Sequence, residues 1–268
     1  MKTTLRPYRY LKFADLETVF DELCSDTLSN FTQSRIGRTL TFGSCFANNL
    51  ASELRMQGID GRSVAIVEYA NTPRANLFYV ECALGEREFA VNTDVETPIS
   101  EAAISEIKTL LTEVDTVVFT LGVAYNWHRR SDNSIVFIPD IRQPKNYLTT
   151  FETPQEHSKT LLDLVRKIRR VNKNCSIWMT LSPVPLEFSF NYRSAIVSDC
   201  VSKSILRTAI HLLQMELKIF YLPTFEFFRW VSGHSPRSFY GADGKVRHVD
   251  SDLVNLVVRK FINLHAMD

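Results

Sequence analysis

The chain has 268 residues, of which 45% are hydrophobic, and a formal net charge of +1 at pH 7. This length is enough to bury the core of one large α/β domain, and the balanced charge gives no reason to expect a nucleic acid or an anionic membrane as a partner. No stretch approaches the roughly 20 apolar residues of a membrane span, and the N-terminus lacks the apolar run of a secretory signal.

Five cysteines stand far apart in the chain, at positions 24, 45, 82, 175 and 200, and none has CxxC spacing. An odd number of scattered cysteines favours reduced thiols over a disulfide framework or a zinc site. We therefore expect a soluble, cytoplasmic protein that binds no metal.

Apolar runs and amphipathic stretches alternate along the chain. A helical spacing over residues 15–24 predicts a first short helix. Buried strands are expected over residues 39–42, 63–67, 115–121, 175–181 and 218–222, with a short antiparallel rim strand over 134–138. Helices are expected over residues 47–58, 73–84, 100–114, 154–171, 194–217 and 251–264. Repeating strand–helix units predict an α/β fold with a parallel sheet and helices on both faces. Without an internal repeat or linker, residues 1–268 are expected to form one domain.

The turn between the first strand and its helix carries the candidate nucleophiles. Gly43 lets the backbone bend sharply there, and the free N–H groups at the helix start stabilise an anion. For Cys45 this position predicts a lowered thiol pKa and a thiolate at neutral pH. Ser44 has the same location but needs a base to activate it. The alternative is a buried structural cysteine.

The string Gly-Ser-Cys-Phe-Ala at residues 43–47 resembles the signature of the GSCFA family, which belongs with the SGNH/GDSL-type esterases and acyltransferases. The resemblance covers about residues 35–265, which leaves residues 1–34 as an N-terminal extension. It implies a three-layer α/β/α sandwich with a mainly parallel sheet. When the string is aligned with the Gly-Asp-Ser turn of the larger group, Cys45 matches the nucleophilic serine and Ser44 matches the aspartate. This alignment favours Cys45 over Ser44 as the nucleophile.

Two further blocks resemble the family's. Asn71 matches the asparagine of a Tyr-Asn-Pro-like string imperfectly, because Thr72 intervenes. It is either an amide donor to an oxyanion or part of an Asx-type turn before a helix. The segment after the strand at 115–121 resembles a Thr-Phe-Gly-Thr-Ala-Tyr block and follows a strand's carboxyl end, where ligand sites lie. Ala124 stands where SGNH enzymes carry an asparagine, so that donor is missing or replaced. The candidates for oxyanion or substrate binding are Asn71, Gly122, Tyr125, Trp127 and Arg129. Residues 127–130 are expected to form a polar loop, which could bind a sugar or a phosphate. The alternative is a loop that is only solvated.

His248 matches the family's C-terminal histidine and precedes the closing helix. In SGNH enzymes an aspartate three residues earlier orients this histidine, and here that position is Lys245. Asp243 takes the aspartate's place if an insertion is allowed, and Asp250 is the second candidate. Ser202 and Lys203 resemble a family Ser-Lys string, but neighbours on a helix point about 100° apart and cannot face each other.

A thiolate, a histidine base and amide donors make an acyl-transfer site. The leading hypothesis is an O-acyltransferase, in particular an acetyltransferase, that acts on a carbohydrate or polysaccharide. It needs no tightly bound cofactor, and acetyl-CoA is the expected donor. The alternatives are a carbohydrate ester hydrolase and a catalytically degenerate module that binds a glycan or CoA.

Overall fold

The computed structural model describes residues 15–28, 36–89, 94 and 101–266. Its main sheet has five parallel strands in the order β2-β1-β3-β7-β8. The strands are β1 (Thr39–Gly43), β2 (Gly61–Ala65), β3 (Thr116–Leu121), β7 (Ser176–Leu181) and β8 (Phe220–Tyr221). Parallel strands need crossovers, and helices supply them between most neighbours. All five predicted sheet strands therefore exist, although β2 begins and ends earlier than predicted and β8 is shorter.

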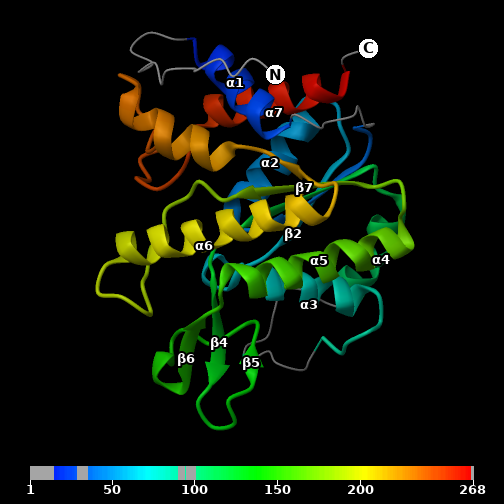
Figure 1. Ribbon diagram of the computed structural model, residues 1–268, viewed down its shortest axis with the longest axis vertical. Coiled ribbons are helices and arrows are strands. Elements are labelled where there is room, and N and C mark those ends of the chain that lie inside the picture. Colours follow the sequence, from blue (N-terminus) through cyan, green and yellow to red (C-terminus); the bar gives the residue numbers. More distant parts are fainter. Residues whose placement is uncertain (1–14, 29–35, 90–93, 95–100, 267–268) are drawn as a thin grey trace.

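Helices cover both faces of this sheet (Figure 1). One layer holds α1 (Leu16–Thr27), α2 (Cys45–Met56) and α7 (Ser251–Ala266). The other holds α3 (Pro73–Ala83), α4 (Glu101–Glu113), α5 (Pro154–Val171) and α6 (Ala195–Glu216). Neighbouring strand residues serve opposite layers: Val117 and Phe119 pack with α3–α6, and Val118 packs with α1, α2 and α7. The predicted three-layer α/β/α arrangement with a mainly parallel sheet is confirmed.

Two predicted helix starts are built by their capping residues. The hydroxyl of Thr72 accepts a hydrogen bond from Ala75 N at 3.0 Å, and Pro73 takes the first helical position. At the start of α5, Thr153 N donates to Glu156 Oε2 at 2.7 Å while Glu156 N donates to Thr153 Oγ1 at 3.3 Å. This reciprocal pair is the predicted capping box.

A second, antiparallel sheet follows β3 and projects from the main body (Figure 1). It consists of β4 (Tyr125–Arg129) between β5 (Ile135–Val136) and β6 (Tyr147–Phe151). The rim strand predicted at 134–138 is confirmed as β5. The polar loop predicted at 127–130 is wrong, because those residues belong largely to β4, and its partner β6 was not predicted. Trp127 is only 2% exposed there, packed among aromatic side chains of the small sheet.

Part of the predicted N-terminal extension is packed against the domain. Lys260 of α7 pairs with Asp21 of α1 at 2.7 Å, and Phe20 of α1 is fully buried. Residues 1–14 and 29–34 of that extension lie outside the described residues. Among the residues that the structure does describe, no helix is both long and apolar enough to cross a membrane.

Candidate active site

Cys45 lies at the carboxyl edge of the main sheet, as the first residue of α2. Gly43, the last residue of β1, has φ +145°, and a Cβ there would stand 1.9 Å from Thr120 Oγ1 of β3. Only glycine therefore lets the chain turn at this point. The turn leaves Cys45 exposed and Ser44 buried, with Ser44 only 6% exposed. The two candidate nucleophiles thus differ in access to solvent.

The thiol of Cys45 has a raised pKa, which corrects the expectation of a lowered one. Partial burial of the sulfur is the largest cause, and the negative charge of Glu68 is the next. Hydrogen bonds from the Ser44 hydroxyl and the Phe46 N–H, and the charge of Arg247, act in the opposite direction. The helix N-terminus therefore stabilises the thiolate as predicted, but desolvation outweighs it.

His248 is paired with Asp243. Its Nδ1 lies 2.7 Å from Asp243 Oδ2, and the two side chains are 40% and 50% exposed. The Lys245 N–H, 3.0 Å from Asp243 Oδ1, and the His248 ring hold the pKa of Asp243 below its usual range. Asp250, the second candidate partner, instead caps α7: its Oδ1 accepts from Leu253 N at 3.2 Å. The structure therefore selects Asp243 as the partner of His248.

A groove of about 390 Å³ connects the histidine to α2. His248 and Asp243 form one wall, and Asn49, Ser52 and Met56 contribute to the other. These three residues follow Cys45 by four, seven and eleven positions, which places all of them on the helix face that Cys45 begins. Cys45 itself is not among the residues that line this groove, and no hydrogen bond joins it to His248 in the described part of the chain.

Asn71 organises the turn that follows β3. It is fully buried, and its Nδ2 donates to Thr120 O at 2.6 Å. Its backbone oxygen accepts from Gly122 N at 3.0 Å and from Val123 N at 3.1 Å. The Gly122 N–H is therefore already bonded. The predicted oxyanion roles of Asn71 and Gly122 stay predictions. Of the first N–H groups of α2, that of Ala47 already donates to Ser44 O at 3.0 Å, so the candidate backbone donors beside the thiol are those of Cys45 and Phe46.

The three candidates on β4 differ in what they contact. Trp127 donates from Nε1 to Tyr69 O at 2.9 Å, and Arg129 pairs with Asp94 and Asp132. Tyr125 is fully buried, its hydroxyl has no hydrogen-bond partner among the described residues, and it lines a pocket of about 280 Å³. The walls of this pocket come from Val67, Glu68, Tyr69, Tyr125, Ile141, Leu186, Glu187 and Phe188. Of the three, Tyr125 is the one that borders a pocket, and its predicted role in binding stays a prediction.

Sequence reasoning missed an ion-pair cluster beside Cys45. Arg247 Nη1 lies 2.9 Å from Glu68 Oε1 and 2.8 Å from Pro185 O, and Nη2 lies 2.6 Å from Glu187 Oε2. This cluster fastens the His248 loop to the strand ends. Arg247 and Glu68 are 179 positions apart, and no local pattern marks such a pair.

Ser202 and Lys203 contact different atoms of the turn after β3, as expected for adjacent residues of a helix. Ser202 Oγ accepts from Ala124 N at 3.4 Å, and Lys203 Nζ donates to Gly122 O at 2.7 Å. Neither contacts the other as nucleophile and base.

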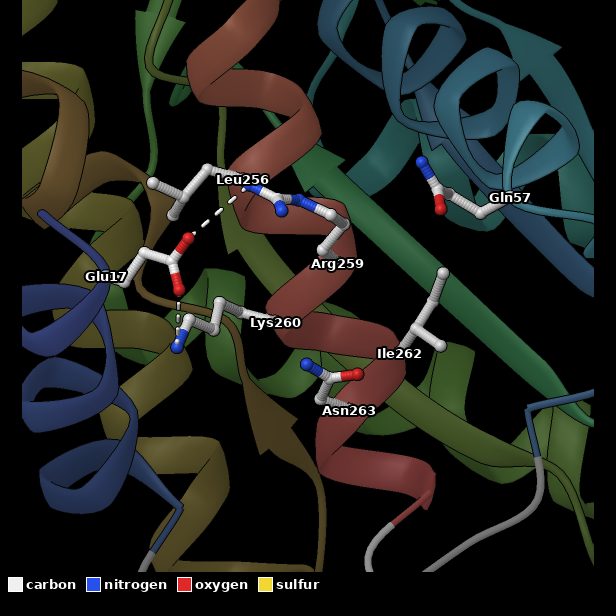
Figure 2. Close-up of a pocket in the computed structure, with 7 residues that line it drawn as sticks. All are labelled: Glu17, Gln57, Leu256, Arg259, Lys260, Ile262 and Asn263. Carbon is white, nitrogen blue, oxygen red and sulfur yellow. Dashed lines mark hydrogen bonds and ion pairs between the residues drawn. The ribbon is translucent and has the colours of Figure 1, made fainter.

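Another hollow lies far from these residues (Figure 2). It is formed by Glu17 of α1, Gln57 after α2 and the face of α7 that includes Arg259 and Lys260. Gln57 and Cys45 stand at opposite ends of a twelve-residue helix, roughly 18 Å apart. Glu17 pairs with Lys260 at 3.4 Å and with Arg259 at 3.5 Å across this hollow. No group of acidic, histidine and cysteine side chains suited to a metal ion occurs among the described residues.

The GSCFA family profile matches residues 38–261, and the chain belongs to the GSCFA family. No curated protein matches the sequence. Among solved structures, the fold resembles a GDSL-like lipase from Bacteroides thetaiotaomicron, with 10% identity, coverage of 94% of this chain and 100% of that one, and a TM-score of 0.47.

Two further solved structures resemble this chain. One is the periplasmic domain of a lipopolysaccharide acetyltransferase from Salmonella ser. Paratyphi A, with 11% identity and a TM-score of 0.41. The match covers 96% of this chain and 99% of that one. An acetyl xylan esterase from Butyrivibrio proteoclasticus has 9% identity, covers 85% and 63%, and has a TM-score of 0.45.

Proposed function

We propose that this chain is an acyl-transfer enzyme with Cys45 as the nucleophile and His248 as the base. The observation that carries the proposal is the placement of the exposed thiol at the start of α2, because later residues on the same face of this helix line the groove of the His248–Asp243 pair. Ser44 is the second candidate nucleophile. Its burial, and the hydrogen bond from its hydroxyl to the thiol, favour Cys45.

Asp243 fixes how His248 acts. Because Nδ1 faces the carboxylate, Nε2 is left to take the thiol proton. The thiolate then attacks the carbonyl carbon of an ester or thioester, and the helix N-terminus stabilises the oxyanion. The imidazolium returns the proton to the leaving group, and an acyl-cysteine remains. The thiol and imidazole are not hydrogen-bonded here, as is common in enzymes without substrate.

The acceptor that attacks the acyl-cysteine decides the reaction. The pocket beside Glu68 offers aromatic walls and a carboxylate, which suit a hydroxyl-bearing carbohydrate. We therefore propose O-acyl transfer, in particular of acetyl, to a carbohydrate. A cytoplasmic location would make acetyl-CoA available as the donor. Arg129 is ion-paired and Trp127 is buried, so the donor proposal rests on the ready reaction of a thiol with a thioester.

Hydrolysis of a carbohydrate ester is the second candidate. The exposed imidazole of His248 favours it, because water can reach the base as easily as a sugar can. Both reactions share the acyl-cysteine and differ only in what attacks it.

The test supplies acetyl-CoA with and without candidate glycans and follows free CoA, free acetate and acetylated sugar. Intact mass of the wild-type protein and of Cys45→Ala locates the acyl group. A transferase releases CoA much faster with acceptor and leaves an acetylated product. A protein that ignores acetyl-CoA but cleaves a simple acetyl ester is an esterase. If the protein is never acylated and turns over neither substrate, the proposed enzymatic function is wrong. The remaining hypothesis is then a module that binds a glycan or CoA.

A further inference from the structure

The two amides predicted to stabilise the oxyanion are both engaged in other hydrogen bonds. The side-chain amide of Asn71 donates to Thr120 O at 2.6 Å, and Asn71 is fully buried. The Gly122 N–H donates to Asn71 O at 3.0 Å. Ala124 stands where SGNH enzymes carry an asparagine, so that position offers no side-chain donor. The oxyanion of the proposed reaction therefore needs a donor from another part of the site.

The backbone beside the thiol supplies part of what is needed. Within the turn that begins α2, the Ala47 N–H donates to Ser44 O at 3.0 Å, which leaves the Cys45 and Phe46 N–H groups for an oxyanion. Oxyanion holes commonly combine backbone N–H groups with the side chain of an asparagine or a glutamine. A side-chain amide close to Cys45 would complete this one.

Asn49 carries such an amide, four positions after Cys45 on the same helix. Residues four apart on a helix lie on one face with their Cβ atoms about 5–6 Å apart, and helical side chains lean toward the N-terminal end. The side chain of Asn49 therefore lies over the turn that Cys45 begins. Both residues are exposed, so one ligand can reach the two side chains together.

Asn49 also lines the groove of about 390 Å³ whose other wall carries His248 and Asp243. Of the α2 residues that line this groove, Asn49 is the nearest to Cys45 along the helix, since the others follow it in the chain. A substrate carbonyl that reaches the thiol from this groove therefore passes the Asn49 amide.

The amide of Asn49 is available to such a ligand, because no group among the described residues is hydrogen-bonded to it. Its neighbour Asn48 differs, since Asn48 Oδ1 accepts from Ser63 Oγ at 2.6 Å. Water satisfies an exposed amide, and a substrate oxygen can displace that water without breaking a bond within the protein.

We propose that Asn49 is a catalytic residue whose Nδ2 donates to the acyl carbonyl oxygen and then to the oxyanion. The inference rests on the proposed function, because it concerns the oxyanion that forms when Cys45 attacks. As the thiolate forms the S–C bond, the carbonyl π pair moves onto the oxygen, which accepts from Asn49 Nδ2 and the Cys45 N–H. As that pair returns, the bond to the leaving group breaks and the imidazolium of His248 supplies the proton. Asn49 keeps both amide protons.

The experiment compares acylation with alkylation of the same thiol. p-Nitrophenyl acetate acylates Cys45 through an oxyanion, and p-nitrophenol release at increasing ester concentration separates the maximal acylation rate from the half-saturating concentration. Iodoacetamide alkylates the thiolate by direct displacement of iodide, so that reaction passes through no oxyanion. All proteins carry Cys200→Ser, because Cys200 is the other exposed cysteine. Intact mass locates the added groups, with Cys45→Ala as the background.

Asn49→Leu removes the amide and keeps a similar size on a good helix former, whereas Asn49→Gln keeps a donor on a longer side chain. We expect Asn49→Leu to lower the maximal acylation rate by about 10²-fold, the usual loss for one oxyanion donor, with little change in the half-saturating concentration. Asn49→Gln should recover part of that loss. The matched control Asn48→Leu should acylate normally, and all of these variants should be alkylated at the wild-type rate.

Acylation of Asn49→Leu at the wild-type rate overturns the proposal. An equal loss of acylation and alkylation in Asn49→Leu also overturns it, because the substitution would then have disturbed the thiol itself. In both cases an acylated wild-type protein leaves the proposed function standing. A wild-type protein that is alkylated at Cys45 but never acylated overturns the proposed function and the role of Asn49 together.

Discussion

The imidazole of His248 and the carboxylate of Asp243 face each other across 2.7 Å at the surface of the protein. The pair lies in a tight loop in which Gly241 and Gly244 both have positive φ, and Gly241 N donates to His248 O at 2.9 Å. The loop therefore builds the pair by itself, without a buried carboxylate. The contact of Nδ1 with the carboxylate fixes the orientation of the imidazole ring.

The first prediction separates the two candidate nucleophiles. Cys45→Ala should abolish turnover of an acyl donor, whereas Ser44→Ala should keep a measurable fraction, because its hydroxyl only hydrogen-bonds the thiol. Initial rates at equal folded concentration test this. A fully active Cys45→Ala protein would move the nucleophile to Ser44.

The second prediction concerns the base. His248→Ala should lower the rate at least about 10²-fold, which is typical for the loss of a general base. Asp243→Asn should lower it less, because the ring loses its orientation but keeps its nitrogen. His211→Ala, an exposed residue of α6, is the control. A loss of less than about tenfold in His248→Ala would contradict the assignment.

The third prediction tests the turn at Gly43. A Cβ at this position would lie 1.9 Å from Thr120 Oγ1 and 2.8 Å from Thr120 O, in a backbone conformation that side chains disfavour. Gly43→Ala should lower the free energy of unfolding by about 3 kcal/mol or more. Gly58 also has a positive φ, +82°, but a Cβ there would meet open space. Gly58→Ala should therefore lower the free energy of unfolding by only about 1 kcal/mol. Urea unfolding compares the two variants, and equal losses would show that Thr120 does not confine the turn.

The fourth prediction is a pH dependence of stability from His157. This histidine is fully buried, its Nε2 lies 2.9 Å from Ala124 O, and burial lowers its pKa. Below the unfolded value of about 6.5 the unfolded chain binds the extra proton, so stability should fall as pH drops toward the folded pKa, by up to about 1.4 kcal/mol per pH unit.

His157→Gln keeps a donor for Ala124 O and removes the titration. Its free energy of unfolding should therefore vary less between pH 7 and pH 5 than that of the wild-type protein, with His211→Gln as control. Glu152 Oε2, 3.4 Å from Nδ1, is the acid that faces the ring. Parallel curves for His157→Gln and wild type would contradict a buried neutral histidine.

The sequence by itself determined the elements whose signals are local. The alternation of apolar strands with helices predicted the parallel sheet. Thr153 and Glu156 predicted the start of α5, because a capping box is a contact between residues three positions apart. Glycine before Ser44 marked the sharp turn for the same reason. The pairing of His248 with Asp243 could also be anticipated, since five positions separate them.

Only the tertiary structure decided what depends on distant partners. Strand β4 was mistaken for a loop because β6, which pairs with it, comes from later in the chain. The sequence left Asn71 as either an amide donor or part of a turn, and only the structure shows that its amide donates to Thr120 O of β3. The helix N-terminus predicted a lowered thiol pKa for Cys45, but burial and the charge of Glu68 raise it. Desolvation and charge–charge energies depend on distances in space, which residue spacing along the chain does not contain.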